Sequence, residues 1–311
     1  MAEISDHEAV HTVLGGLQPG GPCLSWLAGL VACEALRLTQ RFNKSTPWSI
    51  RCFAYFGLAM SATLAGLFAS VLYHYCVRGY GDYEALKYVT RVLRYHFFCS
   101  RIATLAGFLF YTHSVWNSKT GKMKICKIPI VQIILVLINA CLGGLFALRL
   151  LRLFKILTFR EFGGTWLFER SGYAIQLVCG VLLTFIKAYD LYHSDAISKV
   201  LALKDDPFRC AWGTLCILCQ TAIFPTIFDT ISVCQYQADG MSGASYSILS
   251  VSAELHLFGP IMAISAALDD EEIVVCGTPC PVGRNDLDAR DVAKPSVIFQ
   301  SLEKEEENDK V

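Results

Sequence analysis

Residues 128–148 read IPIVQIILVLINACLGGLFAL, and no charge occurs between Lys127 and Arg149. At about 1.5 Å per residue, a helix of this length spans roughly 31 Å, which is the thickness of the hydrocarbon core of a bilayer. A soluble helix would present a polar stripe to water, whereas the interruptions here, Gln132 and Asn139, do not recur at helical spacing. The stretch therefore predicts a transmembrane helix.

The composition of the whole chain is typical of a membrane protein with several spans. Of its 311 residues, 54% are hydrophobic and only 17% are charged. Further apolar stretches resemble the first one, and together with it they cover residues 17–38, 52–77, 95–116, 128–148, 172–192, 210–233 and 246–268. The sequence thus predicts an all-α, polytopic membrane protein in which seven transmembrane helices form a bundle with short loops.

Charge divides the chain into three parts. Residues 1–14 are polar and lack Lys and Arg, so we expect a short N-terminal tail. Residues 15–268 form the predicted transmembrane domain. Residues 269–311 carry 12 Asp or Glu and 5 Lys or Arg, which predicts a disordered acidic tail.

The orientation follows from the Lys and Arg residues beside the predicted helices. Loops one, three and five carry twelve of them and loops two and four carry nine, whereas the N-terminal segment and loop six carry none. Because cytoplasmic loops are enriched in Lys and Arg, we expect the N-terminus outside and the acidic C-terminal tail in the cytoplasm.

Ionisable residues inside the predicted spans are the candidate site. A charge at the bilayer centre costs about 2.5 to 3.5 kcal/mol, so such residues tend to be paired or functional. We single out four of them: Arg101, Asp229, Glu254 and His256. Two interpretations remain open, a polar cluster that joins Arg101 to Glu254 or Asp229 around a ligand cavity, and pairs that only fix helix packing. Side chains two residues apart point about 200° apart, so Glu254 and His256 cannot both face one cavity.

Motifs of enzymes and of metal or cofactor sites are weak in this sequence. Residues 7–11 match the H-E-x-x-H zinc pattern, but they fall in the predicted tail, and the pair Cys216 and Cys219 falls in an apolar stretch. The fourteen cysteines mostly lie in or beside apolar segments, where thiols act as small hydrophobes. No phosphate-binding glycine loop, nucleophile elbow or nucleic-acid surface is recognisable. We therefore predict a protein that is not an enzyme, with no cofactor, no metal and no nucleic-acid partner.

One segment carries a resemblance to a known family. Residues 72–86, LYHYCVRGYGDYEAL, resemble the end of the second helix and the next loop in an uncharacterised seven-helix membrane family of basidiomycete fungi, a domain of unknown function. LGGL at 14–17 and FLFYTHSVW at 108–116 extend the resemblance over most of residues 14–268. It implies a seven-helix fold and no established activity. Family members tend to have Arg near the end of the third helix, where this chain has His113.

Two function classes fit these observations. A receptor-like seven-helix sensor is favoured by the helix count, the orientation and the lack of an internal repeat, and a small-molecule transporter or channel is the alternative, favoured by the intramembrane charges. The expected partners are the lipid bilayer and a small-molecule ligand of unknown identity. A closed pocket that opens to one side supports a receptor, whereas a polar path that reaches both faces supports transport.

Overall fold

The computed structural model describes residues 6–42, 46, 48–79, 88–117, 130–155, 166–193, 207–239 and 243–276. Within these ranges the chain is almost entirely helical, and no strand is formed. In chain order the elements are α1 (Asp6–Gln40), α2 (Trp48–Leu72), the π-helix η1 (Tyr73–Arg78), α4 (Arg91–Asn117), α5 (Ile130–Leu153), α7 (Trp166–His193), α9 (Pro207–Gln220), α10 (Ile223–Asp239) and α11 (Gly243–Cys276). The predicted all-α class is confirmed.

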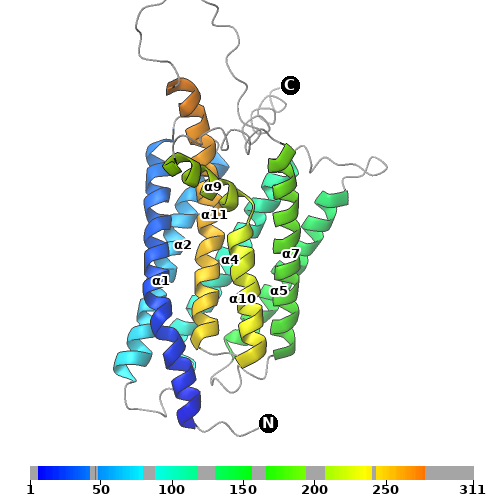
Figure 1. Ribbon diagram of the computed structural model, residues 1–311. Helices are drawn as coiled ribbons and strands as arrows, with labels where there is room; N and C mark the ends of the chain where they lie inside the picture. Colours follow the sequence, from blue (N-terminus) through cyan, green and yellow to red (C-terminus); the bar gives the residue numbers. More distant parts are fainter. Residues whose placement is uncertain are drawn as a thin grey trace, which may run out of the picture.

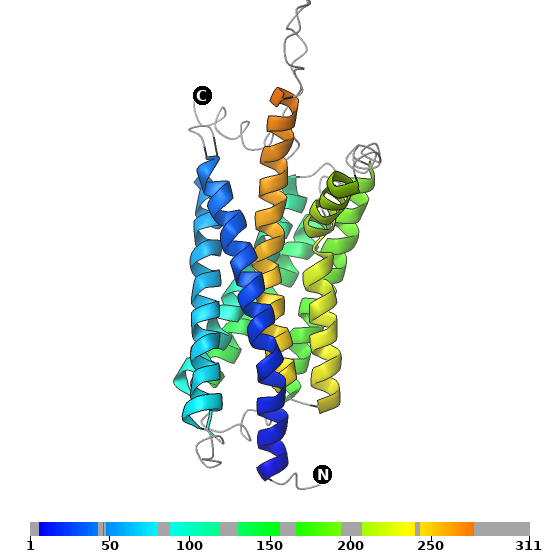
Figure 2. The same ribbon diagram turned by 60° about the vertical axis from the view of Figure 1, so that its left-hand side comes forward.

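The long helices run side by side, and α11 lies in the middle of them (Figures 1 and 2). It packs against α1, α2, α4, α9 and α10, and the remaining neighbours meet in the pairs α1–α2, α2–α4, α4–α5, α4–α7, α5–α7 and α7–α10. The first residue of α1 and the last of α11 lie at opposite ends of the molecule (Figure 1). Between Tyr246 and Ser265, most residues of α11 are therefore buried among other helices.

The peripheral helices bury one narrow stripe each. In α2 the buried residues alternate at spacings of four and three, at Ile50, Ala54, Gly57, Ser61, Leu64, Phe68 and Val71. That period places them on one face of a helix. The described part of α1 repeats it with Leu24, Ala28, Val31, Ala35 and Leu38. Each helix thus has a face turned away from the core.

Large apolar side chains occupy those outward faces. On α5 they include Ile133, Leu137, Leu148 and Leu151, of which Leu137 is 59% exposed and Leu151 68% exposed. Apolar surface of this extent is unfavourable in water and favourable in lipid. The outer surface therefore fits a bilayer.

Three helical segments are long and apolar enough to cross a membrane: Trp48–Arg78, Gly172–Tyr189 and Tyr246–Ser265. The pair Gly213–Cys219 and Ile223–Gln235 meets the same test as one span bent by 57°, which makes up to four among the described residues. Membrane localisation is thus supported, but the count is below the seven spans predicted.

Charged residues explain part of the difference in count. Glu34 and Arg37 lower the mean hydropathy at the end of α1, and Arg94 and Arg101 do so in α4. In α5, which contains the stretch that most strongly predicted a span, the test covers only Ile133–Leu148, because the side chains on either side of this stretch lie outside the description. Polar groups inside a bundle reduce hydropathy without preventing insertion, because neighbouring helices satisfy them.

Two predicted boundaries lie elsewhere in the structure. Helix α1 begins at Asp6, which places residues 6–14, expected in a tail, in the helix. Helix α11 continues to Cys276, eight residues beyond the predicted end at 268. The remainder of the predicted acidic tail, from residue 277 onward, lies outside the described residues.

The predicted sixth span, 210–233, is two helices. Pro225 has no N–H and its ring clashes with the carbonyl four residues earlier, that of Thr221, so a helix cannot continue through this point unchanged. The chain turns at Thr221 and Ala222, and Ala222 has a φ of 60°. Pro225 is then accommodated in the first turn of α10.

The start of α4 is fixed by a contact with η1. The Tyr75 hydroxyl donates to the carbonyl of Tyr88 at 2.9 Å and accepts from the N–H of Thr90 at 3.1 Å. Thr90 caps α4, because its Oγ1 accepts from the N–H of Leu93 at 3.2 Å. This anchor sets the register in which α4 presents the polar residues described next.

Candidate functional site

Helix α11 is divided into two halves of opposite chemistry. From Ser247 to His256 it buries polar side chains, none more than 6% exposed, namely Ser247, Ser250, Ser252, Glu254 and His256. We call residues 247–256 the polar half. Residues 257–264, the apolar half, carry only apolar side chains, and the next buried polar one on α11 is Ser265. Polar groups without solvent need partners on neighbouring helices, so the polar half defines a candidate site.

Asp229 of α10 is the main partner of the polar half. Its Oδ2 lies 3.1 Å from Nε2 of His256, and its Oδ1 accepts a hydrogen bond from Ser252 Oγ. All three side chains are at most 2% exposed. The trio joins α10 to α11 through two hydrogen bonds at one carboxyl group.

The hydrogen-bond pattern assigns the roles in this trio. Asp229 accepts twice, which matches an ionised carboxylate. An ionised carboxylate can only accept, so Nε2 of His256 must be the donor to Oδ2. Nδ1 of His256 has no hydrogen-bond partner. A neutral imidazole leaves a bare lone pair there, whereas an imidazolium would leave a buried N–H donor unpaired at greater cost. We therefore describe the trio as a carboxylate with a neutral histidine and a serine.

Glu254 points to the other side of α11. Its Oε2 accepts from Ser61 of α2 at 2.8 Å, and its Oε1 has no hydrogen-bond partner. Leu64 and Leu257, each three residues along the helix from Ser61 and Glu254, belong to an apolar cluster with Ala103 of α4. Since His256 turns toward α10, the prediction that Glu254 and His256 cannot share a cavity is confirmed.

Arg101 of α4 has neutral partners. Its guanidinium donates to Gln176 Oε1 at 3.3 Å and to the hydroxyl of Tyr173, both on α7. It also lies 4.7 Å from the ring centre of Tyr173 and 5.4 Å from that of Phe146, which adds cation–π attraction. Within the described residues no ion pair joins Arg101 to Asp229 or Glu254.

The four predicted site residues therefore separate into three groups. Asp229 and His256 are in direct contact, Glu254 pairs with Ser61, and Arg101 is held by α7. The direct pairing of Arg101 with a carboxylate, one reading of the sequence, does not occur in the structure. The opposite charges suggested that pairing, but the rotation of each helix about its axis decides which side chains come into contact.

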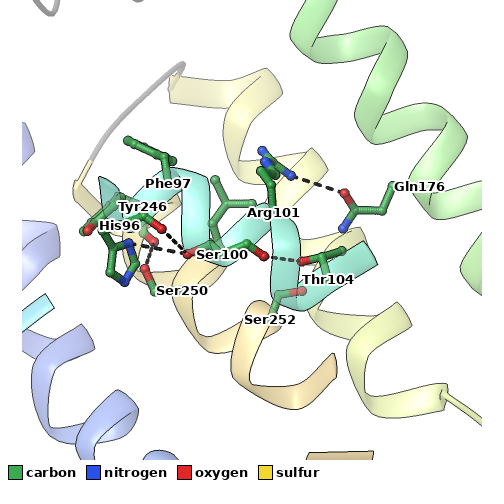
Figure 3. Close-up of a pocket in the computed structure, with 10 residues that line it drawn as sticks. His96, Phe97, Ser100, Arg101, Thr104, Gln176, Tyr246, Ser250 and Ser252 are labelled. Carbon is green, nitrogen blue, oxygen red and sulfur yellow. Dashed lines mark hydrogen bonds between the residues drawn. The ribbon is translucent and has the colours of Figure 1, made fainter. Parts of the chain in front are cut away.

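A small cavity lies between these groups (Figure 3). Arg101, Ser100 and Thr104 of α4, Gln176 of α7, and Ser250 and Ser252 of α11 supply its polar lining, and His96, Phe97, Tyr246 and Leu249 complete it. Its volume is about 10 Å³. That is room for about one water molecule and far below the roughly 300 Å³ at which small-molecule pockets begin.

His96 is a further buried group that the sequence did not single out. It is 0% exposed, its Nδ1 lies 3.4 Å from Ser100 Oγ, and its Nε2 has no hydrogen-bond partner. Its ring packs edge-on against Phe68 at 5.6 Å. Four residues complete the site: His96, Ser252, Tyr173 and Gln176. Of these, only Ser252 had a signal in the sequence, the high density of serines at the start of the seventh span.

Metal sites were not expected, and two sequence patterns are relevant. The H-E-x-x-H residues 7–11 lie in α1, where their side chains are outside the description, as is that of Cys216. In the part of the chain that is described, no group of three or more His, Cys, Asp or Glu is arranged to hold a metal ion.

Comparison of the chain with protein-family models, with curated proteins and with solved structures gives no match. The resemblance to the basidiomycete family therefore stays a prediction from the sequence. Any function must be argued from the site itself.

Proposed function

We propose that this protein is a receptor-like membrane sensor built on seven helical columns, α1, α2, α4, α5, α7, the bent pair α9–α10, and α11. The observation that carries the proposal is the division of α11. Buried polar groups reach from the start of the helix to His256 and are followed by the apolar residues 257–264. A central helix whose buried side chains are polar in one half only fits a receptor, whereas a permeation path along that helix needs polar groups through to the far side.

The orientation argument adds to this proposal. The polar half lies toward the end of the molecule where α1 begins (Figure 1). With the N-terminus outside, as the Lys and Arg distribution predicts, the polar half is nearer the outer face. A ligand from outside would meet it before reaching the apolar half.

The size of the cavity shows which structural change ligand binding would require. At about 10 Å³ the cavity excludes an organic molecule, so ligand binding requires separation of the helices around it. The contacts of Asp229 with Ser252 and His256 hold α10 against α11. We call this trio the lock, because we propose that it holds α10 against α11 in a closed arrangement. A ligand would separate the helices by binding the open arrangement more tightly.

A transporter is the second candidate, and Glu254 favours it. A carboxyl group that is 0% exposed and has one unpartnered oxygen is costly, and such groups recur in proton relays of transporters. The two candidates differ in what they do in a sealed vesicle, because only a transporter moves solute or protons across it.

The test uses the full chain reconstituted in liposomes. We expect no proton or small-dye flux above that of empty liposomes, for the wild type and for Asp229→Asn. Hydrogen exchange should rise in α10 and in the polar half of α11 for Asp229→Asn, because one hydrogen bond of the lock is weakened. Thr230→Val is the matched control, since Thr230 is exposed on α10 and its hydroxyl bonds only the helix carbonyl of Thr226. Flux in the wild type, or unchanged exchange in Asp229→Asn, would reject the sensor.

A further inference from the structure

The cavity between α4, α7 and α11 has a lining whose hydrogen-bond capacity can be assigned group by group. The protons of its four serine and threonine hydroxyl groups are all engaged, whereas the Tyr246 hydroxyl, which also lines the cavity, has no hydrogen-bond partner. Ser100 donates to the carbonyl of His96 at 2.9 Å, Thr104 to that of Ser100 at 2.9 Å, and Ser250 to that of Tyr246 at 2.8 Å. Ser252 donates to Asp229. Toward the cavity these hydroxyl groups therefore offer lone pairs and act as acceptors.

The donors at the cavity come from the opposite wall. Arg101 has five N–H groups, of which one donates to Gln176 and one to Tyr173. Gln176 accepts from Arg101 through Oε1, so its amide N–H groups are additional donors. The occupant of the cavity must accept on the Arg101 side and donate on the hydroxyl side.

This requirement separates the candidate occupants. A small anion could accept from Arg101 but would face the lone pairs of four hydroxyl groups. A cation could bind those lone pairs but would lie beside the Arg101 charge. A water molecule both accepts and donates, and about 10 Å³ is the volume that one water needs.

We propose that the cavity is a binding site for one water molecule, which accepts from the Arg101 guanidinium and donates to Ser252 Oγ. Ser252 in turn donates to Asp229, so the water completes a hydrogen-bonded chain from the arginine to the carboxylate. Arg101 and Asp229 are then an ion pair mediated by water and serine, which gives the buried Asp229 and the partly buried Arg101 a partner of opposite sign. This water site does not depend on whether the protein is a sensor or a transporter.

A double-mutant cycle on the full-length protein, purified in detergent, tests this series of hydrogen bonds. Arg101→Leu, Asp229→Asn and the double variant are compared by thermal unfolding. Each single change leaves the other charge without its partner, so the double variant should lose about 2 to 4 °C less than the two single losses together. Glu254→Gln is the control partner for Arg101→Leu, and that pair should be additive because Glu254 faces α2.

Variants that fill the cavity then distinguish coupling through the water molecule from direct electrostatic attraction between Arg101 and Asp229. In a Thr104→Ile background the added carbon atoms occupy the space of the water, and the coupling of Arg101 to Asp229 should fall to the error of the measurement. Thr63→Ile is the matched control, because Thr63 is exposed on α2 and makes the same hydroxyl bond, to the carbonyl of Ala59 at 2.7 Å. Ser250→Val serves as a second filling variant.

Two results would overturn the proposal: additivity of Arg101→Leu and Asp229→Asn, or coupling that survives both filling variants. If neither filling variant folds, an experimental density map of the unmodified protein at a resolution that shows water decides. A peak within hydrogen-bond distance of both Arg101 and Ser252 supports the site, and an empty cavity or an ion there rejects it.

Discussion

The polar and apolar halves of α11 are equally buried, yet they are held in the bundle by different forces. The polar half is bound to α2 and α10 by directional hydrogen bonds of Glu254, Ser252 and His256. The apolar half has side chains such as Leu257 and Ile261 at 0% exposure, so dispersion and close packing hold it. Together they form one span by hydropathy, Tyr246–Ser265, but only one half carries chemistry.

The boundary between the halves is a point of unusually close helix approach. Pro260 has no N–H, so the carbonyl of His256 lacks its usual helical partner. Gly107 of α4 faces that carbonyl, and a Cβ on Gly107 would lie 2.9 Å from the Cβ of His256 and overlap its carbonyl oxygen. Small residues allow such approaches between helices in membranes. The comparison predicts that the polar half is sensitive to lost partners and that the boundary is sensitive to added volume.

The largest effect is expected in the polar half. Asp229→Leu leaves Ser252 and Nε2 of His256 without their acceptor, and each buried donor left unpaired costs about 1 to 3 kcal/mol. Thermal unfolding in detergent should show a large loss. Asp229→Leu with His256→Leu should recover much of it, because an apolar pair leaves fewer unpaired groups. A double variant less stable than Asp229→Leu alone would contradict the pairing.

A smaller loss is expected at the boundary. Gly107→Ala adds a methyl group against the backbone of His256, which cannot move as a flexible side chain can, and overpacking costs about 1 to 3 kcal/mol. Gly66→Ala is the matched control. Gly66 is exposed on α2 with nothing within 4 Å of an added Cβ, so helix propensity alone should raise stability by up to about 1 kcal/mol. Equal effects of the two changes would argue against close approach at Gly107.

Beside the apolar half, a single hydrogen bond can be removed without changing volume. The hydroxyl of Tyr111 donates to the carbonyl of Cys219 at 2.8 Å, next to the turn between α9 and α10. Tyr111→Phe should therefore lower stability by about 1 kcal/mol. Tyr55→Phe, at a side chain that is 54% exposed, should leave the unfolding temperature unchanged. A loss in Tyr55→Phe as large as that in Tyr111→Phe would show that the hydrogen bond is not the cause.

Much of this fold could be predicted because hydropathy acts locally. Apolar stretches marked the helices, although the sixth stretch was predicted as one span and forms two helices, α9 and α10. The ends of α1 and α11 were harder to predict, because polar residues such as Asp6 and Asp269 continue a helix without an apolar signal. Hydropathy measures the free energy of transfer from water to lipid, and it does not measure the tendency to form a helix.

The candidate site could be predicted only in part. Burial of ionisable groups follows from their place in apolar stretches, so Asp229, Glu254 and His256 were identified. Their partners depend on the rotation of each helix about its axis, which a single sequence does not specify. Arg101 shows the consequence, since it is held by neutral groups on α7 that had no charge to mark them.

The smallest effect, of opposite sign, is expected at the turn between α9 and α10. Ala222 has a φ of 60°, where a side chain costs about 1 to 2 kcal/mol that glycine does not incur. Ala222→Gly removes this strain but increases the entropy of the unfolded chain, which offsets about 0.4 to 1 kcal/mol. The net gain should be about 0.5 kcal/mol, measured as a small rise in unfolding temperature. Ala253→Gly is the control, because Ala253 is also 1% exposed but lies inside α11, where glycine should lower stability by about 1 kcal/mol. A loss at Ala222 as large as that at Ala253 would mean that the turn is not strained.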